Sequence, residues 1–227
     1  MSAIEPGAGA PAGPAGPAGP GDPSGVTLAI DYPDRPLNRL STALRLFAAI
    51  PILVVLCSIS GETFGSAGNN GGSGFAAAGG LLVLGPLVML VFRGRYPGWW
   101  FAWNLEFARF STRVGAYLAL MDDRYPSTED EQSVHLDIAD PGRTPRLSRW
   151  LPLVKWLLAI PHYIVLFFLW IGAVVAVIAA WFAILVTGRY PRGLFTYVEG
   201  VIRWQLRVVA YAAILTTDAY PPFRLAP

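Results

Sequence analysis

Charged residues and cysteine are scarce in this chain of 227 residues, and both scarcities limit the class of protein to which it can belong. Charged residues make up 14% of the sequence and hydrophobic residues 54%, whereas about 25% charged is usual for a soluble domain. The single cysteine, Cys57, cannot form a disulfide within the chain, so a buried and inert thiol is expected. The composition therefore predicts a membrane protein that does not depend on disulfides.

Lysine is also nearly absent, because Lys155 is the one lysine and all other basic residues are arginines. The sequence has no run of five basic residues, which argues against nucleic-acid binding. It has no GxSxG, Walker or HExxH pattern, and no second histidine or cysteine lies at ligand spacing from His162. We therefore expect no catalytic residues, no metal site and no cofactor.

Residues 1–25 contain mostly glycine, proline and alanine and almost no apolar anchor, which predicts a disordered tail. The tail has no basic start followed by an apolar stretch, so it is not typical of a secretory signal.

Two segments of the chain, 94–126 and 188–223, resemble each other after a shared GRYP sequence. Their alignment places Arg109 on Arg203 and Arg113 on Arg207, and Leu28–Ile30 recurs upstream as Leu136–Ile138. Arg45 falls on Lys155, and Ile52 falls on His162. We therefore predict two copies of one unit, repeat 1 at 26–126 and repeat 2 at 134–227, joined by a linker at 127–133.

Long apolar runs predict helices that cross a membrane. The runs at 44–60 and 75–92 are each about 26 Å long as helices and flank a Gly-rich loop, which indicates a transmembrane hairpin. The run at 151–187 is too long for one ordinary crossing. Two crossings that meet near Trp170–Gly172 are preferred, and one bent helix that crosses from about Pro161 is the alternative. The hairpin arrangement puts the basic loops on one side, so both termini are expected to be cytoplasmic.

Each GRYP is followed by a striped apolar segment that predicts an amphipathic helix in the membrane interface. Charged residues recur at helical spacing in both segments, namely Glu106, Arg109 and Arg113 in the first and Glu199, Arg203 and Arg207 in the second. The short alternating stretches at 26–31 and 134–138 are possible strands that pair with each other. The predicted fold is all-α and polytopic, with two parallel repeats that each contain a hairpin and an interfacial helix.

The segment 188–223, with GRYPRGLF, Arg203-Trp204, Arg207 and a closing YPPF, resembles an uncharacterised membrane family. This family is a domain of unknown function that is common in high-GC Gram-positive bacteria. The resemblance extends over about 28–225, and Ile160-Pro161-His162 also fits it. It implies a membrane location and no assigned reaction.

The first hypothesis for function is an integral inner-membrane, multi-pass, non-enzymatic accessory or scaffold module. In this hypothesis the arginine pairs Arg109/Arg113 and Arg203/Arg207 face an anionic lipid headgroup or an acidic envelope partner. The alternative is a structural role, in which these arginines form ion pairs with Glu106 and Glu199 within their own helices. A small transporter or lipid-handling protein with a site at the repeat interface is the second hypothesis. His162 is a candidate polar site within the membrane, although a hydrogen bond from its ring to a backbone carbonyl freed by Pro161 is the preferred explanation.

Overall fold

The computed structural model describes residues 24–33, 36–60, 98–127, 132–141, 148 and 150–226, and these are mostly helical. The tail at 1–23, the Gly-rich loop and the apolar run 75–92 lie outside the described residues. The elements are β1 (Val26–Ile30), α1 (Arg39–Ala48), α2 (Ile50–Ser60), α4 (Gly98–Leu118), β2 (Val134–Ile138), α5 (Pro152–Leu158), α6 (Ile160–Thr187), α7 (Arg192–Val209) and the π-helix η1 (Ala210–Ile214).

The strands β1 and β2 form a two-stranded antiparallel ribbon in which Leu28 is opposite Leu136. The predicted pairing of the two stretches is thus confirmed. Side chains alternate along each strand, so Leu28 and Leu136 are buried while Ala29, His135 and Asp137 are exposed. This alternation turns one face of the ribbon toward the helices and the other toward the outside.

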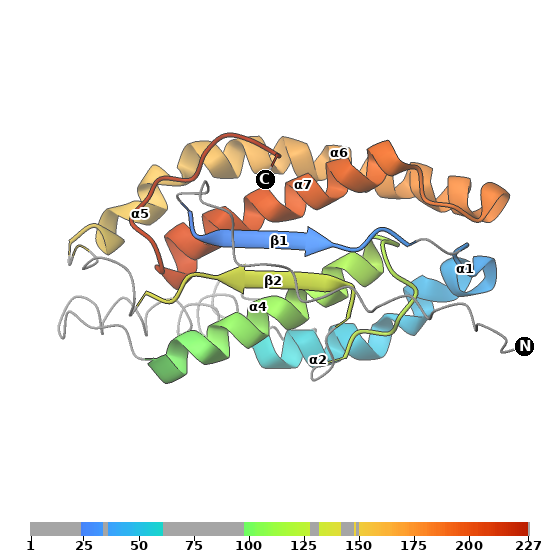
Figure 1. Cartoon of the computed structure of the whole chain (residues 1–227), viewed down its shortest axis with the longest axis horizontal. Helices are drawn as coiled ribbons and strands as arrows, with labels where there is room; N and C mark the ends of the chain where they lie inside the picture. Colours follow the sequence, from blue (N-terminus) through green and yellow to red (C-terminus); the bar gives the residue numbers. More distant parts are fainter. Residues whose placement is uncertain are drawn as a thin grey trace, which may run out of the picture.

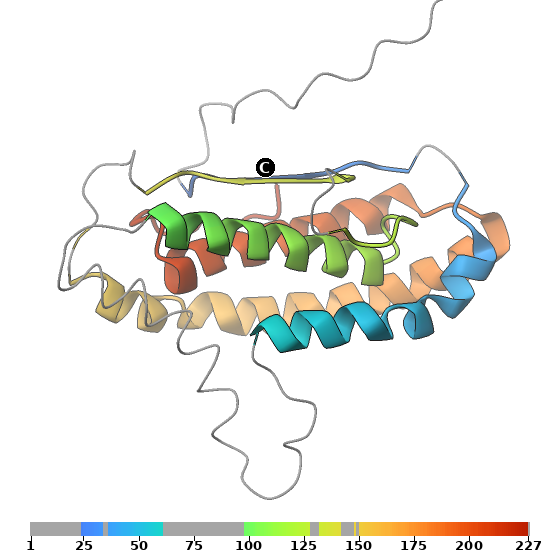
Figure 2. The same ribbon diagram turned by 90° about the horizontal axis from the view of Figure 1, so that it is seen from below.

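The described elements form three layers (Figures 1 and 2). The ribbon is the first layer, α4 and α7 are the second, and α2, α5 and α6 lie on the far side of the second layer, with α1 at one end. The ribbon, α4, α7 and α6 all run along the long axis of the molecule in both views. The charged stripes of α4 and α7 therefore lie between an apolar layer and the ribbon.

Helix α6 packs on α7 through small side chains. Ala173, Ala176 and Ala180 are buried at helical spacing, and this row allows the two backbones to approach. The Tyr197 hydroxyl of α7 donates a hydrogen bond to the Leu169 carbonyl at 3.1 Å. Most bulky side chains of α6 lie on its opposite face and are exposed, so α6 contributes little of its apolar surface to the core.

The preferred prediction of a helix turn near Trp170–Gly172 is wrong, because α6 is one continuous helix of 28 residues. The break in the apolar run falls earlier, at Ala159, and the next helix begins at Ile160 with Pro161 in its first turn. Gly172 does not make a turn; a Cβ at this position would lie 2.4 Å from the Tyr197 hydroxyl. The glycine therefore makes room for a neighbouring helix, and the alternative of one bent helix describes the break correctly.

Among the described residues, α6 is long and apolar enough to cross a membrane, and only 22% of its most apolar window is buried inside the protein. The pair α1 and α2 passes the same test together, with a bend of 50° at the break between them. The described residues therefore contain fewer candidate membrane spans than the predicted multi-pass arrangement requires. The second half of the first predicted hairpin lies outside the described residues.

Candidate functional site

Two arginines of the middle layer bind the two central carbonyls of the ribbon. Ala139 donates to the Gly25 carbonyl and Asp31 to the Ser133 carbonyl, so the strands bond to each other at the odd-numbered positions of β1. The carbonyls of the paired residues Leu28 and Leu136 therefore point away from the partner strand.

Arg203 of α7 donates from Nε and Nη2 to the Leu28 carbonyl at 3.2 and 3.1 Å. Arg109 of α4 donates from Nε to the Leu136 carbonyl at 2.9 Å. Each arginine thus satisfies an acceptor on one outer edge of the ribbon, which would otherwise lack a partner. The contacts are reciprocal along the chain, because Arg109 binds the second strand and Arg203 the first.

Each of these arginines also forms an ion pair with the glutamate of its own helix, as the alternative of a structural role predicts. Arg109 contacts Glu106 at 2.6 Å, and Arg203 contacts Glu199. The side chains of Arg203 and Glu199 are 8% and 15% exposed, whereas those of Arg109 and Glu106 are 31% and 59% exposed. The same ion pair is therefore buried beside β1 and largely hydrated beside β2.

The second arginine of each pair holds the segment that follows its helix. Arg113 donates from Nη1 to the Ser127 carbonyl at 3.0 Å. Arg207 donates to the carbonyls of Arg224 and Ala226, both at 3.1 Å. Both arginines are buried, Arg207 almost completely, so their charges stabilise returning backbone segments.

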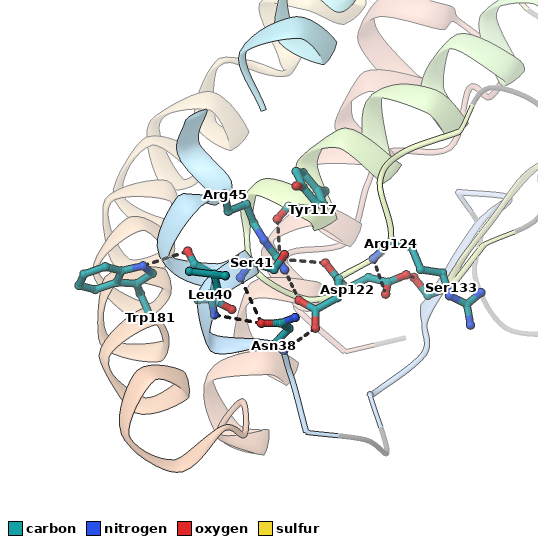
Figure 3. A network of polar contacts seen from close by, with 11 residues as sticks. Asn38, Leu40, Ser41, Arg45, Tyr117, Asp122, Arg124, Ser133 and Trp181 are labelled. Atoms are coloured by element: carbon teal, nitrogen blue, oxygen red, sulfur yellow. Dashed lines mark hydrogen bonds and ion pairs between the residues drawn. The ribbon is translucent and has the colours of Figure 1, made fainter. Parts of the chain in front are cut away.

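A buried cation at the end of α4 forms the polar network in Figure 3. Arg45 of α1 forms an ion pair with Asp123 and donates from Nη1 to the carbonyls of Tyr117 and Asp122 at 3.1 and 2.8 Å. Its guanidinium group lies 4.7 Å from the centre of the Tyr117 ring. The cation thus joins α1 to the turn that follows α4.

The same network determines where α1 begins. The Asn38 side chain accepts from the backbone N–H groups of Leu40 and Ser41, as an N-cap does, while its own N–H donates to Asp123 at 2.8 Å. Asp122 accepts from the Ser133 hydroxyl at 2.6 Å (Figure 3), which connects the turn to the start of β2.

A second buried cation lies at the end of α7. Lys155 of α5 contacts Asp218 at 2.7 Å and donates to the Thr217 carbonyl at 2.6 Å. Its ammonium group lies 5.2 Å from the centre of the Tyr211 ring. Burial lowers the pKa of Lys155, and the hydrogen bond and charge of Asp218 oppose this shift.

The two cations have the same kinds of partner, namely a tyrosine ring, a backbone carbonyl and an aspartate. Just before each aspartate, Leu120 and Leu215 both adopt a left-handed backbone with φ of 64°, an uncommon conformation for a bulky residue. The alignment of the two segments pairs Arg45 with Lys155, and with one added residue it also pairs Asp123 with Asp218, so the aspartate partners of the two cations could have been found from the sequence.

His162 is fully buried at the start of α6. Its Nδ1 accepts the indole N–H of Trp204 at 3.1 Å, so the ring is neutral with its proton on Nε2. Phe223 stacks on the ring at 4.0 Å between centroids. The expected bond to a carbonyl near Pro161 is replaced by this contact with α7, and within the described part of the chain Nε2 has no hydrogen-bond partner.

The arginine pairs are directed to acceptors of this chain, and the described residues contain no cluster of three acidic, histidine or cysteine side chains that could hold a metal ion. The geometry can therefore fasten helices to the ribbon and to the chain segments that follow α4 and α7. Contact of these arginines with a lipid headgroup or an acidic partner stays a prediction.

The fold and these contacts define a mostly helical protein with one long apolar helix that is largely uncovered. Residues 149–224 match the model of a family described as a domain of unknown function (DUF4389), which confirms the predicted resemblance for this part of the chain. The matched range contains α5, α6, α7 and η1. No curated protein and no solved structure matches the chain.

Proposed function

We propose that this protein is a non-enzymatic membrane-bound module that serves as an accessory or scaffold subunit of the cell envelope. The observation that carries the proposal is the apolar surface of α1, α2, α5 and α6. Many large apolar side chains along this layer are at least 39% exposed, among them Phe47, Val54, Trp156, Phe168 and Ile171. Soluble proteins rarely leave a continuous surface of this kind in water.

We further propose that the chain consists of two parallel repeats, 26–126 and 134–227. The support comes from pairs of aligned residues with equal contacts. Arg109 and Arg203 bind paired carbonyls of the ribbon, and Arg45 and Lys155 bind aligned aspartates. A duplicated unit that is attached to the membrane through its apolar layer would present two similar polar ends to an envelope partner or to anionic lipid.

Fractionation of cells that express the full chain tests the membrane assignment. We expect the protein in the membrane pellet after washing with alkaline carbonate, and in the soluble fraction only after detergent is added. Recovery in the cytosol without detergent would contradict the proposal. Purification in a mild detergent then distinguishes the roles, because a stoichiometric protein partner supports a scaffold.

One observation favours the alternative of a lipid-handling protein. A cavity of about 340 Å³ lies between α1, α4 and α6, where the two proposed repeats meet. Its lining is mostly apolar, with Arg45 and Thr42 as its polar members. The lipid-handling function predicts that the purified protein holds lipid and no protein partner. The Val177→Trp variant, which fills the cavity, should then release that lipid, whereas the outward-facing Val175→Trp variant should keep it. These results together would replace the scaffold function with the lipid-handling function.

A further inference from the structure

We infer that α6 lies in the plane of the membrane and does not cross it, so the protein is inserted in a single leaflet. This inference rests on the proposed membrane attachment and specifies its geometry. The length of α6, about 42 Å for 28 residues, exceeds the roughly 30 Å of a hydrocarbon core but sets no orientation by itself. The orientation follows from what lies beside α6.

Helix α7 accompanies α6 over most of its length. Trp204 binds His162 near the start of α6, and Tyr197 binds Leu169 closer to its middle. At the far end, the Leu37 N–H donates to the Gly188 carbonyl at 2.9 Å, immediately after α6. A polar layer that lies alongside α7 therefore also lies alongside α6.

The ribbon is that polar layer. Arg203 of α7 binds the Leu28 carbonyl of β1, and the hydroxyl of Tyr32, just after β1, donates a hydrogen bond to the Tyr190 carbonyl beyond the end of α6. The ribbon thus runs alongside α6, as Figures 1 and 2 also show. If α6 crossed a bilayer, the ribbon would lie at the depth of the hydrocarbon core.

The outer face of the ribbon is unsuited to hydrocarbon. Asp31, His135 and Asp137 are exposed on it, and Glu106 is exposed beside it on α4. Charged side chains at this depth are costly when they face lipid. A flat orientation avoids that cost, because the ribbon then faces water while the apolar layer faces the acyl chains.

The charges of the apolar layer specify an anionic leaflet as its partner. Helices α1, α2, α5 and α6 contain no aspartate or glutamate. The exposed Arg39 donates to the Val186 carbonyl at 3.0 Å, and the exposed Arg189 follows α6 directly, so both lie at one edge of the layer. Trp150 and Trp156 are exposed at the other end, as is typical of side chains at a membrane interface.

Spin labels on the full chain test this orientation in vesicles of phosphatidylcholine mixed with phosphatidylglycerol. Single cysteines are placed in a Cys57→Ser background at Ile164, Ile171, Val175 and Val186, which share one face of α6 within about 60°. A flat helix puts all four labels at a similar depth, roughly 5–10 Å below the headgroups. A label at Ala29 on the ribbon is the matched control and should stay accessible to a water-soluble relaxation agent.

Each other outcome overturns the inference in a distinguishable way. Labels at Ile164 and Val186 that lie in opposite leaflets, with Ile171 and Val175 deep between them, show a crossing helix and leave the proposed function intact. Labels that remain in water show that the chain does not enter the membrane and overturn both proposals. Labels that are shielded without vesicles, in a protein that is dimeric by light scattering, assign the apolar layer to a second copy.

The charge argument has its own test in vesicle binding. Replacing Arg39 and Arg189 with glutamine should weaken binding to the mixed vesicles by roughly tenfold or more and leave binding to pure phosphatidylcholine unchanged. Replacing the exposed Arg124, which lies in the turn after α4, is the matched control and should change neither affinity. Equal binding of all variants to both vesicles would overturn the assignment of an anionic leaflet.

Discussion

The two arginines that hold the ribbon make the same contact in different surroundings. Arg203 and Glu199 are nearly buried, whereas Arg109 and Glu106 are partly and largely exposed. The difference arises because the C-terminal segment covers α7, where Arg203 also donates to the Leu225 carbonyl at 3.2 Å. Equal geometry therefore need not mean equal energy, since water screens one ion pair and is excluded from the other.

The largest expected effect comes from removing the buried arginine. Arg203→Met leaves Glu199 without its cation and the Leu28 carbonyl without its donor, so the free energy of unfolding should fall by about 3–5 kcal/mol. Arg109→Met should cost about 1 kcal/mol or less, because Glu106 is hydrated. Denaturant unfolding in detergent micelles measures both changes.

Equal losses in the two variants would break the comparison, because burial would then not set the strength of the contact. Adding Glu199→Gln to Arg203→Met should recover part of the loss, since the unpaired buried charge is removed. Release of anionic lipid from the Arg203→Met variant without a loss of stability would instead support the predicted headgroup contact.

The two buried cations differ in the opposite direction, because the first half of the chain has the more enclosed pair. Asp123 is 12% exposed beside Arg45, and Asp218 is 30% exposed beside Lys155. Burial already disfavours the charge on Lys155, as its lowered pKa indicates. Arg45→Met should therefore destabilise the protein by about 3 kcal/mol and Lys155→Met by only about 1 kcal/mol.

Thermal unfolding of both variants measures this order. A similar measurement on Arg45→Lys separates charge from geometry, because lysine keeps the ion pair with Asp123 but loses the planar group that reaches two carbonyls. A greater loss for Lys155→Met than for Arg45→Met would show that the exposure of the aspartate does not decide the strength of these sites.

A polar pair in the second half replaces an apolar pair in the first. His162 and Trp204 are hydrogen-bonded, and the residues aligned with them, Ile52 and Phe110, belong to one apolar cluster. His162→Ile leaves the Trp204 N–H buried without an acceptor and should cost about 1–2 kcal/mol, and Trp204→Phe should cost about 2 kcal/mol. The double variant should recover about 1 kcal/mol relative to the sum of the two losses.

A double-mutant cycle in the same unfolding assay provides this number. Strict additivity would mean that the hydrogen bond between the two rings contributes nothing measurable, and that the substitution of one pair for the other is only a change of volume.

The sequence predicted what depends on local pattern. The strands, the helices that follow each GRYP and the pairing of Arg109 with Glu106 all follow from residue spacing, and the structure contains them. The location of these helices in the membrane interface stays a prediction. The turn at Trp170–Gly172 was wrong because a glycine that admits Tyr197 looks the same in sequence as a glycine in a turn. The carbonyl partners of the arginines could not be predicted, since backbone acceptors have no sequence signal and these lie far along the chain.

The glutamates of the two charged stripes do not align, and the cover over α7 explains why. Gly200 occupies the position aligned with Glu106, and a Cβ on Gly200 would lie 3.0 Å from the Leu225 Cβ and 3.1 Å from its carbonyl oxygen. The covered helix therefore has no room for a side chain there, whereas Glu106 on α4 is exposed. Its counterpart Glu199 lies one position earlier, where it still reaches Arg203.

Gly200→Ala should consequently cost about 1 kcal/mol, because the C-terminal segment must shift against α7. Gly193→Ala in the same helix is the matched control, since a Cβ there meets nothing within 4 Å. It should stabilise the protein by about 0.5–1 kcal/mol through helix propensity. Thermal unfolding of both variants compares them directly. If Gly200→Ala is as stabilising as Gly193→Ala, the C-terminal segment does not pack on α7, and the low exposure of Arg203 and Glu199 that depends on this cover would also be wrong.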